Sequence, residues 1–384
     1  MAETLRSGRV GQLYIAAESP YGTPPTLLAT HAFRHLSFKP SFNPFNRVNS
    51  PAKKQSPGIV ARFDRFGSAG ASIEAMLQPS GTLNTLAEAD PIFELGMGAK
   101  SNITLATTVS AAPSPTTTVF SVAAATGLAV GQAILVVAGG VKYVRWITNI
   151  ATLALTVTPA LPVAPSSGAA VKGCCTYKLA SALATSLCLA HYPSTDTVLS
   201  KIIKGAVVEQ IGLSFTQNEE ARLTASFKAK TQTIAPTKPA SFTTVGTQNP
   251  PSGLTGELYI GAAAYKFRKL DLEINTGVML REDVYGESSP SGILMTGRRS
   301  VTLGIDALKA DEAVIYDQAE SGTRVAVHKQ TGFTEGNIIA LYAPLVDFSV
   351  PDEDDGDDVP VWPFKGICCE SADAANDEVS IAMA

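Results

Sequence analysis

Residues 205–230 read GAVVEQIGLSFTQNEEARLTASFKAK, and this stretch decides the class of fold. Apolar and polar positions alternate along two runs within it, and the apolar side chains stand at Val207, Ile211, Leu213, Phe215, Leu223, Ala225 and Phe227. A period of two predicts half-buried β-strands, and the polar residues 217–220 between the runs predict the turn of a hairpin. The same alternation returns at residues 301–305 and 325–327, so we expect further strands there.

Helical periodicity is confined to two segments. Residues 82–96 place apolar side chains at helical spacing and end at glycine, and residues 310–320 form the second candidate. Together with the alternating runs, these segments predict a mainly β chain (α+β) with about two helices.

The chain carries an internal repeat. The segment FRHLSF, residues 33–38, returns as FRKLDL, residues 267–272, and Ile59 returns as Ile293, both 234 positions later. Two later matches keep the order at offsets of 136 and 137, namely residues 202–203 with 338–339 and residues 227–229 with 364–366. Four matches in one order predict a duplicated fold, with one helix in each copy.

The fall in offset indicates an insertion of about 98 residues in the first copy. Stretches rich in Pro, Ser and Ala, residues 111–115 and 162–168, punctuate five short strand-like runs, which predict a small β-barrel or sandwich. The predicted domains are the first fold in two parts, 1–101 and 176–245, the inserted domain 102–175, and the second fold 246–384. The insert is expected to project from the outer surface.

Composition excludes several classes of protein. The 384 residues carry a net charge of −4, which disfavours a general nucleic-acid binder or a membrane-surface protein. No apolar run reaches the roughly 20 residues that a transmembrane helix needs. The five cysteines form two adjacent pairs and one single residue, which is not a disulfide framework and favours a reducing compartment.

The search for catalytic or ligand-binding chemistry finds little. None of the four histidines has metal-ligand spacing, and the sequence lacks a nucleophile elbow, a phosphate loop and a dinucleotide fingerprint. One acidic run stands out, at Asp352, Glu353, Asp354, Asp355, Asp357 and Asp358. It fails the EF-hand register and reads as a solvated hairpin tip, with a calcium site as the alternative. We therefore predict no enzyme activity, no cofactor and no metal site.

At this point the sequence resembles a known family. Residues 13–25, LYIAAESPYGTPP, resemble the N-terminal segment of major tail tube proteins from long, non-contractile (siphovirus-type) phage tails. A strand at 33–38, a polar excursion from Pro40 to Pro57, a strand pair at 59–77 and a helix ending in FELG, residues 93–96, follow in the family's order. The departure is the duplication within one chain.

The resemblance implies two tandem tail-tube β-sandwich folds, each with a flanking helix, that build a sixfold ring. Stacked rings form the tail tube, the conduit for DNA ejection. The implied partners are other copies of the chain, the tape-measure protein, tail-end proteins and double-stranded DNA in passage, with no membrane. The implied place is the virion tail, assembled in the host cytoplasm.

Two excursions, Pro40–Pro57 and Asn275–Pro290, are expected to be loops that reach the next ring. Apolar and arginine side chains within them are the candidates for ring stacking, because interfaces favour such residues: Phe42, Phe45, Arg47, Met279, Leu280, Arg281 and Tyr285. The alternative is that these side chains fold back on their own domain.

The charge is split between the copies. Residues 1–245 hold 20 Lys and Arg against 11 Asp and Glu, whereas residues 246–384 hold 10 against 23. Two folds per chain predict a ring of three chains, a pseudo-hexamer in which unlike charges alternate, around an inner wall richer in acidic than in basic groups. The rival interpretations are a distal tail or tail-terminator protein, and a surface adhesin or glycan-binding module.

Overall fold

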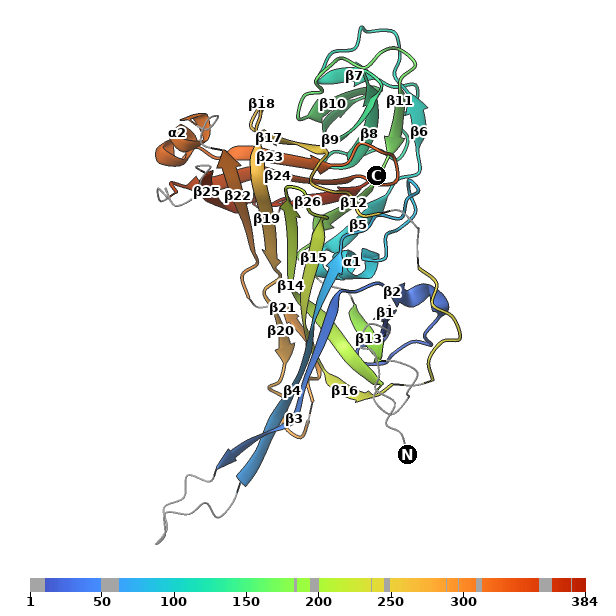
Figure 1. Cartoon of the computed structure of the whole chain (residues 1–384), viewed down its shortest axis with the longest axis vertical. Coiled ribbons are helices and arrows are strands. Elements are labelled where there is room, and N and C mark those ends of the chain that lie inside the picture. Colours follow the sequence, from blue (N-terminus) through green and yellow to red (C-terminus); the bar gives the residue numbers. More distant parts are fainter. Residues whose placement is uncertain are drawn as a thin grey trace.

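The structure is a computed structural model that describes residues 11–49, 62–182, 185–193, 200–235, 237–244, 249–287, 289–295, 297–308, 313–351, 361–373 and 375–384. Strands dominate it, as the alternating runs predict, and the described residues form two α-helices. Figure 1 shows an elongated molecule in which one group of long strands runs along its length and a second group crosses the molecule towards one end.

The first half contains β1 (Gln12–Glu18), a 3-10 turn (Ala29–His31), β2 (Ala32–Phe33), β3 (Ser37–Asn49), β4 (Arg62–Met76), α1 (Asp90–Met97), β5 (Gly98–Asn102), β12 (Cys175–Leu179), β13 (Ser186–Tyr192), β14 (Lys201–Thr216), β15 (Arg222–Ala229) and β16 (Thr231–Ile234). The second half contains β17 (Gly256–Ile260), β18 (Ala263–Ala264), β19 (Phe267–Asn275), β20 (Val278–Arg281), β21 (Gly292–Met295), β22 (Ser300–Leu308), α2 (Ala313–Ser321), β23 (Val325–Thr331), β24 (Ile339–Ser349), β25 (Val361–Cys369) and β26 (Ser380–Met383).

The two halves repeat one order of antiparallel pairing. In the first half the order is β1, β13, β14, β15, β4, β3. In the second it is β17, β23, β24, β25, β22, β19. The segments GQLYI, residues 11–15, and GELYI, residues 256–260, occupy the first strand of each series. Sequence analysis missed this match, although it lies 245 positions apart and needs no gap within it.

A direct seam joins the two series. β14 pairs with β19 along seven residues, from Gln210 with Asn275 to Thr216 with Lys269. Eight strands therefore form one continuous sheet in the order β3, β4, β15, β14, β19, β22, β25, β24 (Figure 1). Its buried side carries the predicted alternating residues, among them Leu213, Leu223 and Leu303.

Helix α1 is shorter than residues 82–96, the range that periodicity predicts. It begins at Asp90 because Pro91 has no N–H to donate to an earlier turn and its ring would clash with the carbonyl four residues before it, so proline fits only in the first turn. Leu83 lies in a turn, and Leu86 lies outside any regular element. Gly96 lies in the helix, where a Cβ atom would stand 2.4 Å from Cδ1 of Ile211 on β14. The glycine therefore allows close packing of α1 on the sheet. Helix α2 lies within one residue of the predicted end at position 320, and residues 309–312 lie outside the described part.

The excursion from Pro40 was expected to be a loop, and this expectation is wrong for its described part. Residues 37–49 form β3, which pairs with β4 from Ser37 with Glu74 to Asn49 with Arg62. The segment contains proline, which an edge strand accepts where the nitrogen faces away from the partner strand. Pro40 and Pro44 are four residues apart in β3, a spacing at which both belong to the same face of the strand. The result is a long hairpin arm that leaves the body of the molecule (Figure 1).

The inserted segment forms a separate sheet of six strands, one more than the five strand-like runs of the sequence. Its strands are β6 (Ala106–Thr108), β7 (Val119–Ser121), β8 (Ala133–Ala138), β9 (Val141–Ala151), β10 (Ala154–Thr158) and β11 (Ala170–Gly173). It has a core of its own around Phe120, Ile134 and Leu155. The domain boundaries drawn from the sequence stay predictions.

The insert does not simply project from the surface. A second apolar cluster joins Leu135, Val144 and Trp146 of the insert to Ile338 and Ala340 of the second half. Trp146 stacks on Tyr342 with ring centroids 5.4 Å apart. The reason is that β8 and β9 bury residues on both of their faces, one towards the insert's own core and one towards the second half.

Candidate assembly surfaces

The outward side of the eight-stranded sheet is a polar face. Residues that are directly opposite in neighbouring strands share a face, so the register defines it. Its members are Ser37, Lys39, Ser72, Glu74, Arg222, Thr224, Ser226, Lys228, Lys269, Asp271, Glu273, Thr302, Gly304, Asp306, Lys365 and Ile367. All of these residues are half-buried or exposed.

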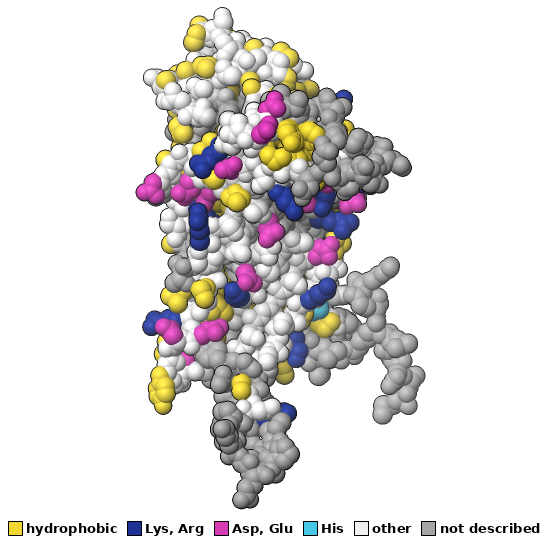
Figure 2. All heavy atoms as spheres, turned by 90° about the vertical axis from the view of Figure 1, so that its left-hand side faces the viewer, with side chains coloured by type: hydrophobic (Ala, Val, Ile, Leu, Met, Phe, Trp, Pro, Cys, Tyr) yellow, Lys and Arg dark blue, Asp and Glu magenta, His cyan; other side chains and the backbone are white. Residues whose placement is uncertain are grey.

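Cross-strand ion pairs neutralise basic groups on this face. Arg222 lies 3.5 Å from Glu74, and Lys228 lies 2.8 Å from Glu209 on the neighbouring strand. In the second half Lys269 pairs with Asp271 at 2.6 Å along the same strand. Seen from the side on which α2 lies, acidic and basic side chains are interspersed with uncharged surface (Figure 2).

Shallow grooves cross the polar face at corresponding places in the two halves. The first, about 240 Å³, runs over β3, β4, β15 and β14 and includes Ser37, Ser72 and Thr224. The second, about 480 Å³, runs over β19, β22, β25 and β24 and includes Asp271, Thr302 and Lys365. Serine, threonine and acidic side chains line much of the first groove, whereas Leu303, Ile367 and glycine backbone contribute much of the surface of the second.

The eight-stranded sheet has two open ends in the single chain. Among the described residues β3 pairs along its length with β4 alone. At the other end β23 pairs with β24 only as far as Val346, and the described residues after it, 347–349, pair with β25 alone. An unpaired edge of 13 residues is a template for another strand.

The ring-stacking candidates lie on two hairpins that point to the same end of the molecule, away from the insert (Figure 1). Phe42 lies on the arm and is 40% exposed. Phe45 and Arg47 belong to β3 by their backbone, but their side chains lie outside the described part.

The second excursion is also a hairpin, formed by β20 and β21, rather than a loop. Its base is anchored because Val278 is buried and Thr276 Oγ1 donates to the carbonyl of Val208 at 2.7 Å. Met279, Arg281 and Tyr285 are exposed and Leu280 is half-buried, with Tyr285 entirely in solvent. The structure thus places exposed apolar side chains beyond the sheet, and their role in stacking stays a prediction.

The acidic run at residues 352–358 lies outside the described residues, so the structure does not test the calcium alternative. Its predicted counterpart, residues 217–220, forms the turn between β14 and β15, as expected. Within the described ranges, no group of three or more His, Cys, Asp or Glu side chains is placed to hold a metal ion.

The cysteines and histidines lie in places that suppress their reactivity. Cys174, Cys175, Cys188 and Cys368 are buried, and burial raises the pKa of Cys188 and of Cys368 to about 12. The ring centroids of His35 and His191 lie 5.7 Å apart. Burial lowers the pKa of His191 to about 4, and the neighbouring His35 adds a smaller lowering effect. The thiols therefore stay protonated and His191 stays neutral at pH 7.

Sequence reasoning missed the polar contacts between the insert and the second half. Arg145 is fully buried, and its Nη1 lies 2.6 Å from Oε1 of Glu257. The Gln330 side chain accepts from the Val144 N–H and donates to the Lys142 carbonyl. A charged residue within a strand gives no sequence signal of a partner 112 positions away.

A family model described as "Phage tail tube protein" matches residues 8–361, which is nearly the whole chain. No curated protein matches the sequence. No helix in the described ranges is both long and apolar enough to cross a membrane.

Proposed function

The chain belongs to the phage tail tube protein family, and we propose that three copies of it close into a ring and that stacked rings form the conduit for DNA ejection. Membership gives the chain a structural role in the virion tail. The ring, its stoichiometry and the passage of DNA are the proposed part.

The seam between β14 and β19 carries this proposal. It joins β14 of the first fold copy to β19 of the second, within one chain. The strand that corresponds to β19 in the first copy is β3, and the strand that corresponds to β14 in the second copy is β24. β3 presents an open edge of 13 residues and β24 an open edge that begins at residue 347, so repeating the internal seam between chains pairs β24 of one chain with β3 of the next. Closure removes every exposed edge of the sheet.

The size of the resulting barrel favours three chains. Three chains give a wall of 24 strands, and strands spaced about 4.8 Å apart then enclose roughly 37 Å between backbones, or roughly 48 Å at a tilt of 40°. Six chains would double these figures. The smaller barrel suits one DNA duplex with side chains lining the wall.

The polar face becomes the inner wall in this arrangement, because the opposite face of the sheet is covered by the core. Its basic groups in the first half are largely paired with carboxylates, and the second half adds Glu273 and Asp306. Phosphates bind surfaces with unpaired Lys and Arg through counterion release. A wall in which Arg222, Lys228 and Lys269 are already paired with carboxylates leaves few cations to hold DNA as it passes.

The two hairpins at one end of the molecule supply the contact with the next ring in this proposal. Phe42 on the arm and Met279 and Tyr285 on the second hairpin offer apolar area that the body of the chain leaves exposed. The tape-measure protein would occupy the lumen before DNA, and tail-end proteins would cap the stack.

Native mass spectrometry of single rings, or a cross-section of the tube by electron microscopy, tests the stoichiometry. Three chains per ring, with unlike folds alternating, is the expected result, and six chains would overturn the proposal. High salt should slow assembly, because opposite charges on neighbouring copies are screened beyond about 8 Å at physiological ionic strength. Purified protein that caps tubes without polymerising would instead indicate a terminator.

A further inference from the structure

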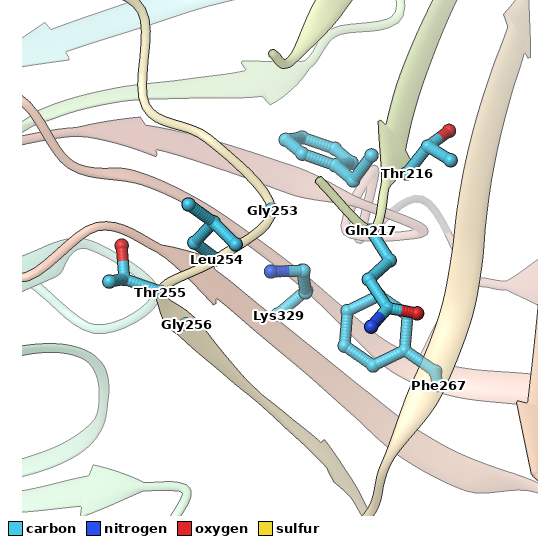
Figure 3. Close-up of a pocket in the computed structure, with 9 residues that line it drawn as sticks. Thr216, Gln217, Gly253, Leu254, Thr255, Gly256, Phe267 and Lys329 are labelled. Carbon is cyan, nitrogen blue, oxygen red and sulfur yellow. The ribbon is translucent and has the colours of Figure 1, made fainter. Parts of the chain in front are cut away.

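A small pocket lies where the two halves of the chain meet (Figure 3). Its volume is about 90 Å³. Phe215 and Gln217 reach it from the end of β14, and Phe267 and Lys329 reach it from the second half. The linker residues 253–256 form its remaining side. The pocket is thus built from both fold copies and from the segment that connects them.

The amino group of Lys329 points into this pocket (Figure 3). The residue is 3% exposed, and its Nζ donates to the carbonyl of Gln330 at 2.9 Å and to Oγ1 of Thr331 at 2.7 Å. Among the residues that the structure describes, no carboxylate lies within 4 Å of this nitrogen. Glu257 is the carboxylate that raises the pKa of Lys329, and it already forms an ion pair with Arg145 at 2.6 Å. A buried ammonium group therefore keeps one N–H without a partner and no counter-charge.

The walls of the pocket are apolar and its rim is exposed. Nζ lies 5.0 Å from the ring centroid of Phe267 and 5.5 Å from that of Phe215. Glycine keeps the rim open, since a Cβ at position 256 would stand 3.0 Å from Nζ. Leu254 is 73% exposed at the rim, so a small group can enter from solvent.

We propose that this pocket binds one carboxylate group on a short stem. The carboxylate oxygens accept a hydrogen bond from Nζ of Lys329 while the stem lies between Phe215 and Phe267. A single cation in an apolar chamber matches a monoanion with a few carbon atoms, whereas a phosphate would bring more charge and more acceptors than the pocket can satisfy. The carboxylate can come from a small molecule in solution or from an Asp or Glu side chain of another copy. The inference does not depend on ring formation.

Binding is linked to pH. Burial lowers the pKa of Lys329 to about 7, against a smaller raising effect from Glu257 on β17. His328, the preceding residue on β23, interacts electrostatically with Lys329, and Arg145 on β9 acts on His328 in turn. A carboxylate binds the ammonium form, so its affinity is full below pH 7 and falls as the pH rises through 7. If only the ammonium form binds, the dissociation constant rises about tenfold from pH 6 to pH 8.

Titration calorimetry on the unassembled full chain tests the proposal, with propionate as the probe and propionamide as its uncharged match at equal ionic strength. The expected result is binding of propionate alone, with the tenfold change between pH 6 and pH 8. Lys329→Met should abolish binding, whereas Lys365→Met, an exposed lysine on β25, should not change it. Equal binding of the two probes, no binding of either at pH 6, or unchanged binding in Lys329→Met would overturn the inference. The comparison of probes needs no variant, so it decides the matter even if Lys329→Met does not fold.

Assembled protein distinguishes the two sources of carboxylate. If the natural ligand is a small molecule, assembled protein binds propionate as the unassembled chain does. If it is a side chain of another copy, assembly excludes propionate and Lys329→Met slows assembly.

Discussion

Replacing Trp146 measures how firmly the insert is fastened to the second half. The side chain is 1% exposed and packs between Tyr342, stacked at 5.4 Å, and His328, whose ring centroid lies 5.3 Å away. Removing such a side chain costs the transfer free energy of its apolar surface and leaves a cavity. Measured costs for Phe or Trp to Ala are about 3–5 kcal/mol, so Trp146→Ala should lower the free energy of unfolding by this amount.

The matched control is Trp146→Phe, which keeps an aromatic ring in the same place. The chain has two tryptophans, so in both variants fluorescence reports only Trp362. That residue lies on β25 of the second half, with its ring 4.8 Å from that of Tyr316. Urea unfolding followed at Trp362 should begin at a clearly lower concentration in Trp146→Ala than in Trp146→Phe.

The result that would refute this reasoning is a Trp362 transition at the same urea concentration in the two variants. The insert would then unfold without affecting the second half. Phe120→Ala supplies a second check, because Phe120 belongs to the insert's own core. Its cost should appear in the insert and reach Trp362 less directly than that of Trp146→Ala.

Three further outcomes are expected. Replacing residues 43–68 of the arm by a two-residue turn should leave the chain folded, because the arm lies beyond the core. The shortened chain should form no long tubes in negative-stain microscopy, and tubes of normal length would show that the arm has no role in stacking. At pH 8 a thiol reagent should modify only Cys369 of the native protein, since the other four thiols are buried and protonated, and fast reaction of two or more thiols would contradict this burial. Gly96→Ala should lower the free energy of unfolding in urea by about 1–3 kcal/mol, because its Cβ would stand 2.4 Å from Cδ1 of Ile211. Gly304→Ala should cost far less, because its Cβ meets nothing nearer than 3.9 Å. Equal costs would show that the contact between α1 and the sheet relaxes freely.

Local pattern accounts for much of the fold. The period of two around Leu213 and Leu223 is a direct consequence of side chains alternating across a strand with one buried face, so it is readable without any tertiary information. The repeat is readable for the same reason, because two copies of one fold bury the same positions. The arm was predicted as a loop from its polar sequence and the family resemblance, and only the pairing with β4 shows that it is an edge strand.

The assembly surfaces were only partly readable. Phe42, Met279 and Tyr285 were selected as apolar residues in polar surroundings, and the structure leaves them exposed on two hairpins. The side of the molecule on which these residues lie, and their place on hairpins, depend on pairing between strands that are far apart in the sequence. Nothing in a sequence marks which of two equivalent edges finds its partner inside the chain.

The sequence by itself determined the mainly β class, the duplication, the insert and the family of the protein, because each is written in the order and spacing of residues along the chain. Only the tertiary structure decided what lies across from what. In the folded chain β14 pairs with β19, and Arg145 forms an ion pair with Glu257. Phe215, Phe267 and the linker line the pocket that holds Lys329. These contacts join residues 52 to 114 positions apart, and their energies depend on distance and burial in space, which no local pattern encodes.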